Sequence, residues 1–143
     1  EDGWWHSGDL ADLCWRGTLP QLKILGRIDD AINSGGETIF PEVLEARIQA
    51  IAKTKGIPLE NIVFLPLKDK DWGERLIALI NFQKEHNVQV FEKYINQFKT
   101  LTQQWAPAER PLSWFLCPSL KYDNKGKMNR KKWLKWLEEN ISN

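Results

Sequence analysis

Hydrophobic and polar residues alternate in short runs over the early part of the chain. Residues 1–20 are rich in Gly, Asp and Trp and show no helical period, so they predict strand pieces and turns. Residues 21–29 alternate before a glycine, which predicts a strand that ends in a turn. Two strand-like runs, 31–34 and 37–40, flank a pair of glycines and predict a hairpin with a glycine tip.

Three later segments carry apolar residues at helical spacing. The first begins at Pro41. Proline has no backbone N–H, but this is harmless here because the N–H groups in the first turn of a helix have no partner within the helix. The second covers 87–103, and the third begins near Asn129, a residue that favours the helix N-cap. Their predicted apolar faces are Leu44, Ile48 and Ile51; Val88, Phe91, Ile95 and Phe98; and Leu134, Leu137 and Ile141.

Two β-branched and aromatic runs, 61–67 and 75–82, are separated by a polar turn. Because each run is continuously apolar, it predicts a strand covered on both faces. Residues 112–117 predict a third buried strand. The order β-hairpin, α, β, β, α, β, loop, α predicts an α+β fold: a small β-sheet flanked by helices, with an N-terminal β-hairpin.

Composition narrows the class of protein. The chain has 143 residues, of which 42% are apolar and eight are Trp, enough for one compact domain without disulfides or metals as staples. A formal net charge of +1 favours neither a nucleic-acid binder nor a membrane-surface protein. No apolar run approaches the roughly 18 residues that span a bilayer, and no signal peptide is evident. We therefore expect a cytoplasmic protein without membrane insertion.

Two further features concern the cysteines and the start of the chain. Cys14 and Cys117 lie far apart and outside any CxxC spacing, so free thiols are favoured over a disulfide. The chain opens without an initiator Met and is already inside a patterned segment at its third residue. This predicts a piece of a longer protein.

Three polar, glycine-bearing segments are poorly explained by packing: residues 5–10, 26–45 and 125–130. Each one alone has an ordinary explanation. A Gly-Asp pair is most often a turn, and adjacent glycines can simply permit positive φ at a hairpin tip. The last segment is not a P-loop. The basic run around it is usually a solvated helix face, and a phosphate-binding patch is the minority reading. That run consists of Lys121, Lys125, Lys127, Arg130, Lys131, Lys132 and Lys135.

Order and spacing together are more specific. The chain resembles the C-terminal end of the superfamily that contains acyl-CoA synthetases, nonribosomal peptide adenylation domains and firefly luciferase. Its motifs run aromatic-x-[ST]-G-D, then G-R-x-D-D-x-I-x-x-x-G-x-x-I-x-P-x-x-[IVL]-E, then P-x-x-x-x-G-K. This sequence supplies HSGDL and GRIDDAINSGGETIFPEVLE, and D-x-x-W-G-E-R from Asp69 to Arg75. Pro118 lies nine residues before Lys127, so we expect a longer final loop.

The resemblance implies roles for residues near the nucleotide. Asp9 matches the carboxylate that accepts hydrogen bonds from the ribose hydroxyls of ATP, and Arg27 matches an arginine near the same nucleotide. Lys127 matches the lysine that meets the substrate carboxylate and the α-phosphate. A carboxylate attacking a phosphate brings two anions together, so a positioned ammonium can offset several kcal/mol of repulsion. Mg²⁺ is implied with ATP, with ligands outside this chain.

The resemblance also implies a moving domain. Ser34, Gly35 and Gly36 match the loop beside the pantetheine arm of CoA, where glycines let the backbone approach a thin ligand. Asp29 matches the hinge about which the small domain rotates, so that one cleft serves two chemistries. Residues 1–27 would be the tail of a large N-terminal domain with the approach to the hinge, and 28–143 the mobile domain. We expect the chain alone to be inactive without that large partner domain.

The last third of the chain reads PAERPLSWFLCPSLKYDNKGKMNRKKWLKWL over residues 107–137 and ends in a predicted helix rich in Lys and Arg. This segment resembles the tail of the o-succinylbenzoate–CoA ligases. This implies a small carboxylate substrate and the pathway to menaquinone or phylloquinone. Another aromatic or medium-chain acyl-CoA synthetase is the alternative. Outside the ligases, the basic C-terminal face leaves open an interaction or nucleic-acid-binding module, and the domain could also be a regulatory module on a separate chain. The near-neutral total charge argues against nucleic acid.

Overall fold

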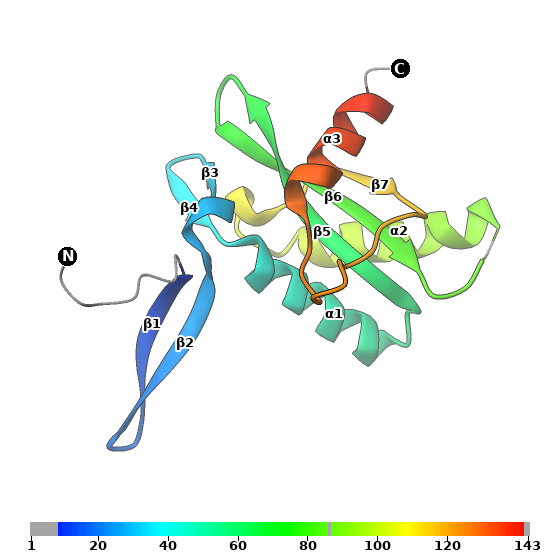
Figure 1. The fold of residues 1–143 in the computed structure, drawn as a ribbon. Coiled ribbons are helices and arrows are strands. Elements are labelled where there is room, and N and C mark those ends of the chain that lie inside the picture. Colours follow the sequence, from blue (N-terminus) through cyan, green and yellow to red (C-terminus); the bar gives the residue numbers. More distant parts are fainter. Residues whose placement is uncertain (1–8, 86, 142–143) are drawn as a thin grey trace.

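The structure, a computed structural model, describes residues 9–85 and 87–141. The described residues begin with an antiparallel hairpin of β1 (Asp9–Arg16) and β2 (Leu19–Arg27), which forms a sheet of its own. The hairpin projects away from the rest of the molecule (Figure 1). A single 3-10 turn, η1 (Ile28–Asp30), joins it to the remaining elements.

The main sheet has five strands, and β6 (Gly73–Phe82) lies at its centre. It pairs antiparallel with the long β5 (Leu59–Asp69) along one edge. Its start pairs with the small hairpin of β3 (Ile32–Ser34) and β4 (Glu37–Ile39). Further along, β6 pairs in parallel with β7 (Ser113–Leu116). The glycine-tipped hairpin predicted from the sequence is thus confirmed as β3–β4.

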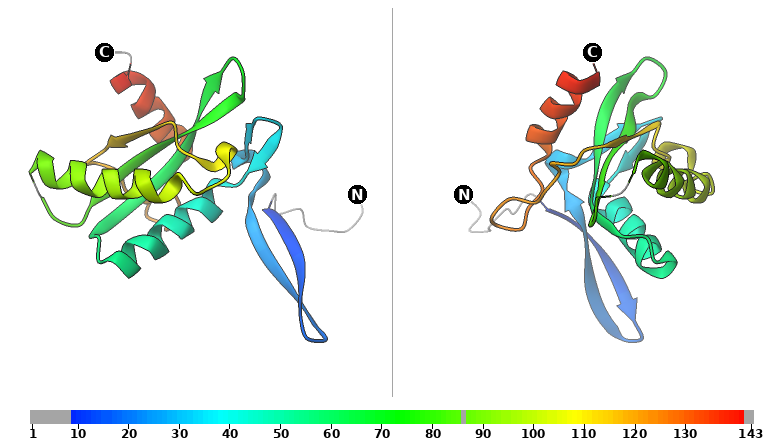
Figure 2. Two further views of the ribbon diagram at one scale, coloured as in Figure 1. Left: turned by 180° about the vertical axis from the view of Figure 1, so that it is seen from behind. Right: turned by 90° about the vertical axis from the view of Figure 1, so that its right-hand side faces the viewer.

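Helices cover both faces of this sheet (Figure 2). One face packs against α1 (Pro41–Lys55) and α2 (Val88–Thr102), and the other packs against α3 (Arg130–Ile141). Alternate residues of the central strands enter the two cores: Ile62 and Phe64 of β5 face one core, and Val63 and Leu65 face the other. The prediction that these strands are buried on both faces is confirmed, and the fold is α+β, as expected.

Local signals at the helix ends are also confirmed. Pro41 is the first residue of α1. Asn129 caps α3, because its side-chain oxygen accepts a hydrogen bond from the Lys132 amide at 3.1 Å. In α2 the same role falls to Asn87, which accepts from the Val90 amide at 2.9 Å.

Two predicted apolar positions and the predicted burial of one strand are wrong in detail. Val88 is 68% exposed because it is the first residue of α2. Ile141, the last residue of α3, is also exposed, and the buried face of that helix is made by Trp133 and Leu137. The β7 strand, Ser113–Leu116, is half-buried rather than buried, because it pairs along one side only. No helix in the described ranges is long and apolar enough to span a membrane.

Candidate functional site

The loop between β7 and α3 carries Lys127, and its start is fixed by two buried amides. The Asn61 and Asn81 side chains both donate to the carbonyl oxygen of Leu120, at 2.9 and 2.8 Å. Asn81 also donates to the Pro118 carbonyl at 3.3 Å and accepts from the Asn61 side chain at 3.1 Å. Because buried polar groups are costly to leave unpaired, this network holds the start of the loop in one place.

A tight turn around Asp123 fixes the backbone next to Lys127. The Asp123 carboxylate accepts hydrogen bonds from the amides of Lys125 and Lys127, at 2.9 and 2.8 Å. The Asp123 amide in turn donates to the Lys127 carbonyl at 2.7 Å, and the Gly126 amide donates to the Asp123 carbonyl at 3.0 Å. Such side-chain-to-backbone bonds are the way in which aspartate stabilises turns.

The Lys127 side chain is exposed and makes no ion pair with any other described residue. It lines a surface pocket that also receives two arginines, Arg27 and Arg130. The carboxylates of this pocket belong to Asp30, Glu42 and Glu45. An ammonium sequestered inside the fold could not act on an external ligand, whereas the one observed here can reach outward.

Two predicted nucleotide-binding residues lie opposite each other at the open end of the first hairpin. The register of β1 and β2 pairs Asp9 with Arg27. Arg27 faces the pocket of Lys127, and its Nη2 lies 4.0 Å from Oδ2 of Asp29. The preceding part of this motif, residues 5–8, lies outside the described residues. The structure thus gathers three of the sequence-predicted site residues in one region.

Asp29 lies within the 3-10 turn between the two sheets, where a hinge was predicted. Its side chain is 83% exposed, so few packing contacts oppose a change of the local dihedral angles. The next residue, Asp30, is more enclosed and lies 3.7 Å from Arg130. The geometry accommodates a hinge at Asp29, and that role stays a prediction.

The glycine-tipped hairpin packs against an indole ring. Gly35 has φ +59°, donates from its amide to the Trp72 carbonyl at 2.8 Å, and leaves no room for a side chain. A Cβ built on Gly35 would lie 2.7 Å from Cε3 of Trp72. Gly36 has φ +83° with open space around the corresponding position. Ser34 is fully buried, and its hydroxyl has no hydrogen-bond partner among the described residues.

The D-x-x-W-G-E-R motif holds this indole in place. The Asp69 carboxylate accepts from the amides of Trp72 and Asp71, both at 2.9 Å, and these bonds hold the pKa of Asp69 below its usual value. The guanidinium of Arg75 stacks over the Trp72 ring at 4.6 Å. Glu74 accepts from the Asn33 amide at 3.0 Å. Sequence reasoning noted the motif, but not that it supports the glycine loop.

The glycine loop and Lys127 do not share a pocket. None of Ser34, Gly35 and Gly36 lines the cavity beside Lys127. The two loops also have separate supports, because Trp72 packs on one and the Asn61–Asn81 pair holds the other. A ligand at Lys127 and a ligand at the glycine loop would therefore meet different surfaces of this domain.

Arg130 was placed by its sequence context in a solvated basic face, and this is wrong. Its side chain is only 12% exposed, and its guanidinium forms a two-pronged hydrogen bond with Glu45, at 2.6 and 2.9 Å. The signal that could have revealed it is the E-x-x-E pattern at Glu42 and Glu45, whose carboxylates share one helix face. The neighbouring Lys131, Lys132 and Lys135 are exposed, as expected.

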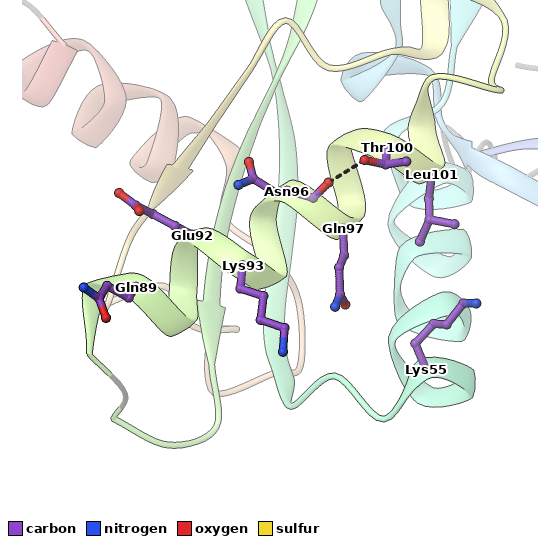
Figure 3. Close-up of a pocket in the computed structure, with 8 residues that line it drawn as sticks. All are labelled: Lys55, Gln89, Glu92, Lys93, Asn96, Gln97, Thr100 and Leu101. Atoms are coloured by element: carbon purple, nitrogen blue, oxygen red, sulfur yellow. Dashed lines mark hydrogen bonds between the residues drawn. The ribbon is translucent and has the colours of Figure 1, made fainter.

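A second surface groove lies on α2 and carries none of the predicted site residues. Its lining combines Lys55 of α1 with side chains of α2 that are polar or charged except for Leu101, as Figure 3 shows. The Thr100 hydroxyl within it donates to the Asn96 carbonyl of its own helix at 3.0 Å. The groove brings together no nucleophile and base, so it offers no evident chemistry.

The described residues do not fit a metal site. No group of three or more His, Cys, Asp or Glu side chains in the described part of the chain is placed to hold a metal ion. The carboxylates of Asp30, Glu42 and Glu45 do gather, but they surround the guanidinium of Arg130. A magnesium ion that accompanies ATP would need ligands other than these residues.

Known proteins resemble the chain over almost its whole length. It is 29% identical to the 2-succinylbenzoate–CoA ligase of Salmonella typhimurium, over 99% of this chain and 31% of that protein. It is 31% identical to the same ligase of Haemophilus influenzae, over 82% of this chain and 24% of that one. No family model matches.

Among solved structures, the chain resembles the o-succinylbenzoate CoA synthetase of Bacillus subtilis. In its complex with the acyl-adenylate intermediate, that enzyme matches with a TM-score of 0.67 at 23% identity, over 93% of this chain and 25% of the other. In its complex with ATP and magnesium, the TM-score is 0.66, at 23% identity and over 92% and 24% of the two chains. At this identity the match establishes the fold.

In sequence and fold, the chain resembles a part of the adenylate-forming CoA ligases, the class that its motifs predicted. Within this class, the relatives named above are 2-succinylbenzoate–CoA ligases, for which o-succinylbenzoate CoA synthetase is another name. The chain spans between 24% and 31% of the length of these two curated relatives.

Proposed function

We propose that this chain serves an ATP-dependent acyl-CoA ligase that acts on o-succinylbenzoate, and that Lys127 is its adenylation residue. The observation that carries the proposal is the state of Lys127: exposed, unpaired among the described residues, and held on a fixed turn in the pocket that Arg27 lines. The sequence similarity to 2-succinylbenzoate–CoA ligases supports the choice of acid.

The chemistry follows from charge. In adenylation, the carboxylate of the acid attacks the α-phosphate of ATP, a C–O–P bond forms, and pyrophosphate leaves. Two anionic groups must approach each other, and two unit charges 4 Å apart repel by about 4 kcal/mol at an effective dielectric constant of 20. The Lys127 ammonium would lie between them and offset this repulsion. Arg27 and Asp9 would hold the nucleotide at the end of the hairpin.

The second half-reaction would use the other loop. The thiol of CoA attacks the acyl carbon of the acyl-AMP, a thioester forms, and AMP leaves. Ser34, Gly35 and Gly36 would guide the pantetheine arm, because a backbone without side chains permits close approach. Since this loop and Lys127 occupy different surfaces, rotation about Asp29 would bring each in turn to a cleft in a preceding N-terminal domain.

Substitution of Lys127 in the full-length protein that carries this chain tests the adenylation role. Lys127→Ala should lower the rate of acyl-AMP formation on the order of 10²–10³-fold, the usual loss when one preorganised electrostatic group is removed. Conversion of supplied acyl-AMP with CoA should persist. The measurements are ATP–pyrophosphate exchange for the first step and thioester release for the second.

The matched control is Lys125→Ala, which removes an exposed ammonium from the same turn. It should leave both half-reactions near the unsubstituted rates. Equal loss of the two half-reactions in Lys127→Ala would contradict the proposed division of labour. A panel of acids distinguishes the substrate: o-succinylbenzoate should give the highest kcat/KM, and preference for another aromatic or medium-chain acid would favour the alternative.

Two further variants test the other elements. Gly36→Ala adds a methyl group that meets nothing within the domain, so any obstruction would fall on the pantetheine arm of CoA. It should slow the thioester step while adenylation continues. Asp29→Pro fixes a backbone dihedral at the hinge and should slow the switch between the steps. Unchanged turnover in both half-reactions would reject the corresponding assignment. The 143-residue chain alone should show no ATP–pyrophosphate exchange.

A further inference from the structure

A single side chain connects the Lys127 loop to the hinge and to the body of the domain. Arg130 is the first residue of α3 and lies three positions after Lys127. Its guanidinium binds Glu45 of α1 through two hydrogen bonds, at 2.6 and 2.9 Å, and donates to the Phe64 carbonyl of β5 at 3.3 Å. The same group lies 3.4 Å from Glu42 and 3.7 Å from Asp30.

This cluster is rigid for two reasons. The planar guanidinium matches the two oxygens of Glu45, which fixes the orientation of both groups. Glu45 is fixed in addition by the Phe64 amide, which donates to its Oε2 at 2.8 Å. Burial alone would lower the pKa of Arg130, but the hydrogen bond and charge of Glu45, with Glu42 and Asp30, raise it overall. The guanidinium therefore stays charged and paired.

The other supports hold the loop to the body of the domain and do not reach the hinge, and they include Met128, which packs against the core beneath α3. Asn61 and Asn81 hold the start of the loop at Leu120, and Asp123 closes the turn before Lys127. Neither contact fixes the turn relative to η1, where the hinge lies. Arg130 touches η1 directly through Asp30.

We infer that Arg130 is a positioning residue, which ties the Lys127 loop to Asp30, Glu42 and Glu45 so that rotation at the hinge delivers the lysine to a fixed place. The inference rests on the proposed function of Lys127. Because the ion pair with Arg130 holds Asp30 against the domain, the rotation is confined to residues up to Asp29. Arg130 itself contacts no substrate in this scheme and acts only through Lys127.

The separate support of the glycine loop indicates which half-reaction the loss of Arg130 should affect. Its position depends on Trp72 and not on the Arg130 cluster. Loss of Arg130 should therefore disturb adenylation and spare the thioester step. A general weakening of the domain would lower both.

The test uses Arg130→Lys in the full-length protein, because lysine keeps the charge but cannot form the two-pronged bond. Displacing a catalytic group by about 1 Å can cost on the order of 10²-fold in rate. We expect a loss of that size in the kcat of ATP–pyrophosphate exchange, with little change in the KM for ATP or acid. Thioester formation from supplied acyl-AMP should be retained. Lys131→Ala, an exposed neighbour, is the matched control.

A combination with Lys127→Ala separates positioning from folding. If Arg130 acts through Lys127, then Arg130→Lys should cause no further loss of exchange in the Lys127→Ala protein. A multiplicative loss in the double variant, or equal loss of both half-reactions, would overturn the inference. Asp30→Asn keeps the shape of the hinge and removes one arm of the cluster. It should give a smaller loss confined to adenylation, and a loss confined to thioester formation would also count against the inference.

Failure of the inference is distinguishable from failure of the proposed function. If the unsubstituted protein formed no acyl-AMP with any acid, or if Lys127→Ala retained full exchange, the proposed function would be wrong. If Lys127→Ala lost exchange but Arg130→Lys did not, only the positioning role would be wrong. Urea denaturation of each variant shows whether it is folded under the assay conditions.

Discussion

Replacing Gly35 with alanine tests how closely the glycine loop is packed on Trp72. The Gly35 backbone has φ +59°, a region that L-residues occupy at a cost of about 1–2 kcal/mol. The added Cβ would lie 2.7 Å from Cε3 and 2.9 Å from Cζ3 of the indole, far inside normal contact. The ring cannot yield freely, because Arg75 stacks on it and Asp69 fixes its backbone.

Overpacking of this kind costs roughly a further 1–3 kcal/mol. We therefore expect Gly35→Ala to lower the free energy of unfolding by about 2–5 kcal/mol in total. Gly36→Ala is the matched control, since Gly36 also has positive φ, +83°, but open space around its Cβ position. Gly36→Ala should lower the free energy of unfolding only by the cost of the positive φ, about 1–2 kcal/mol.

Urea denaturation followed by tryptophan fluorescence measures both values, and the m-value checks that the unfolding transition remains comparable. A Trp72→Leu background isolates the ring contact, because Gly35→Ala should be less destabilising there by most of the steric part. Equal effects of the two glycine substitutions, or an unchanged effect in the Trp72→Leu background, would refute the reasoning.

Three further expectations concern the rest of the domain. Burial raises the pKa of Glu42 above its usual 4.5, so the folded state binds this proton more tightly than the unfolded state, and stability falls as the pH rises through the raised pKa. Glu42→Gln should lose less stability than the unsubstituted protein as the pH is raised from about 4 to 7 in a series of urea titrations, and parallel curves would contradict this. Cys117 is fully buried and burial raises its thiol pKa, so iodoacetamide should modify it only in urea, as peptide mass spectrometry would show; rapid labelling of Cys117 in the native domain would be the opposing result. Asn81→Ala leaves the Leu120 carbonyl with one donor fewer and should destabilise by about 1–3 kcal/mol, whereas Asn124→Ala on the exposed turn should change stability by less than about 0.5 kcal/mol.

The sequence alone determined the elements whose causes are local. Proline and asparagine mark the starts of α1 and α3 because capping involves backbone groups only a few residues away. The continuous apolar runs of β5 and β6 required cover on both faces, and the two cores supply it. Motif order predicts roles for Lys127 and the glycine loop for the same reason, since each motif is a short, contiguous pattern.

Only the tertiary structure decided which distant residues meet. Arg130 binds Glu45, which lies 85 positions away in the sequence. The indole that excludes a side chain at Gly35 is that of Trp72, which belongs to another hairpin. Periodicity places Trp133, Leu137 and Ile141 on one face of α3, four positions apart. Only the position of the helix against the sheet decides that this face is buried at Trp133 and exposed at Ile141. Contacts over long sequence separations depend on how the elements are placed in space, and no local pattern encodes that placement.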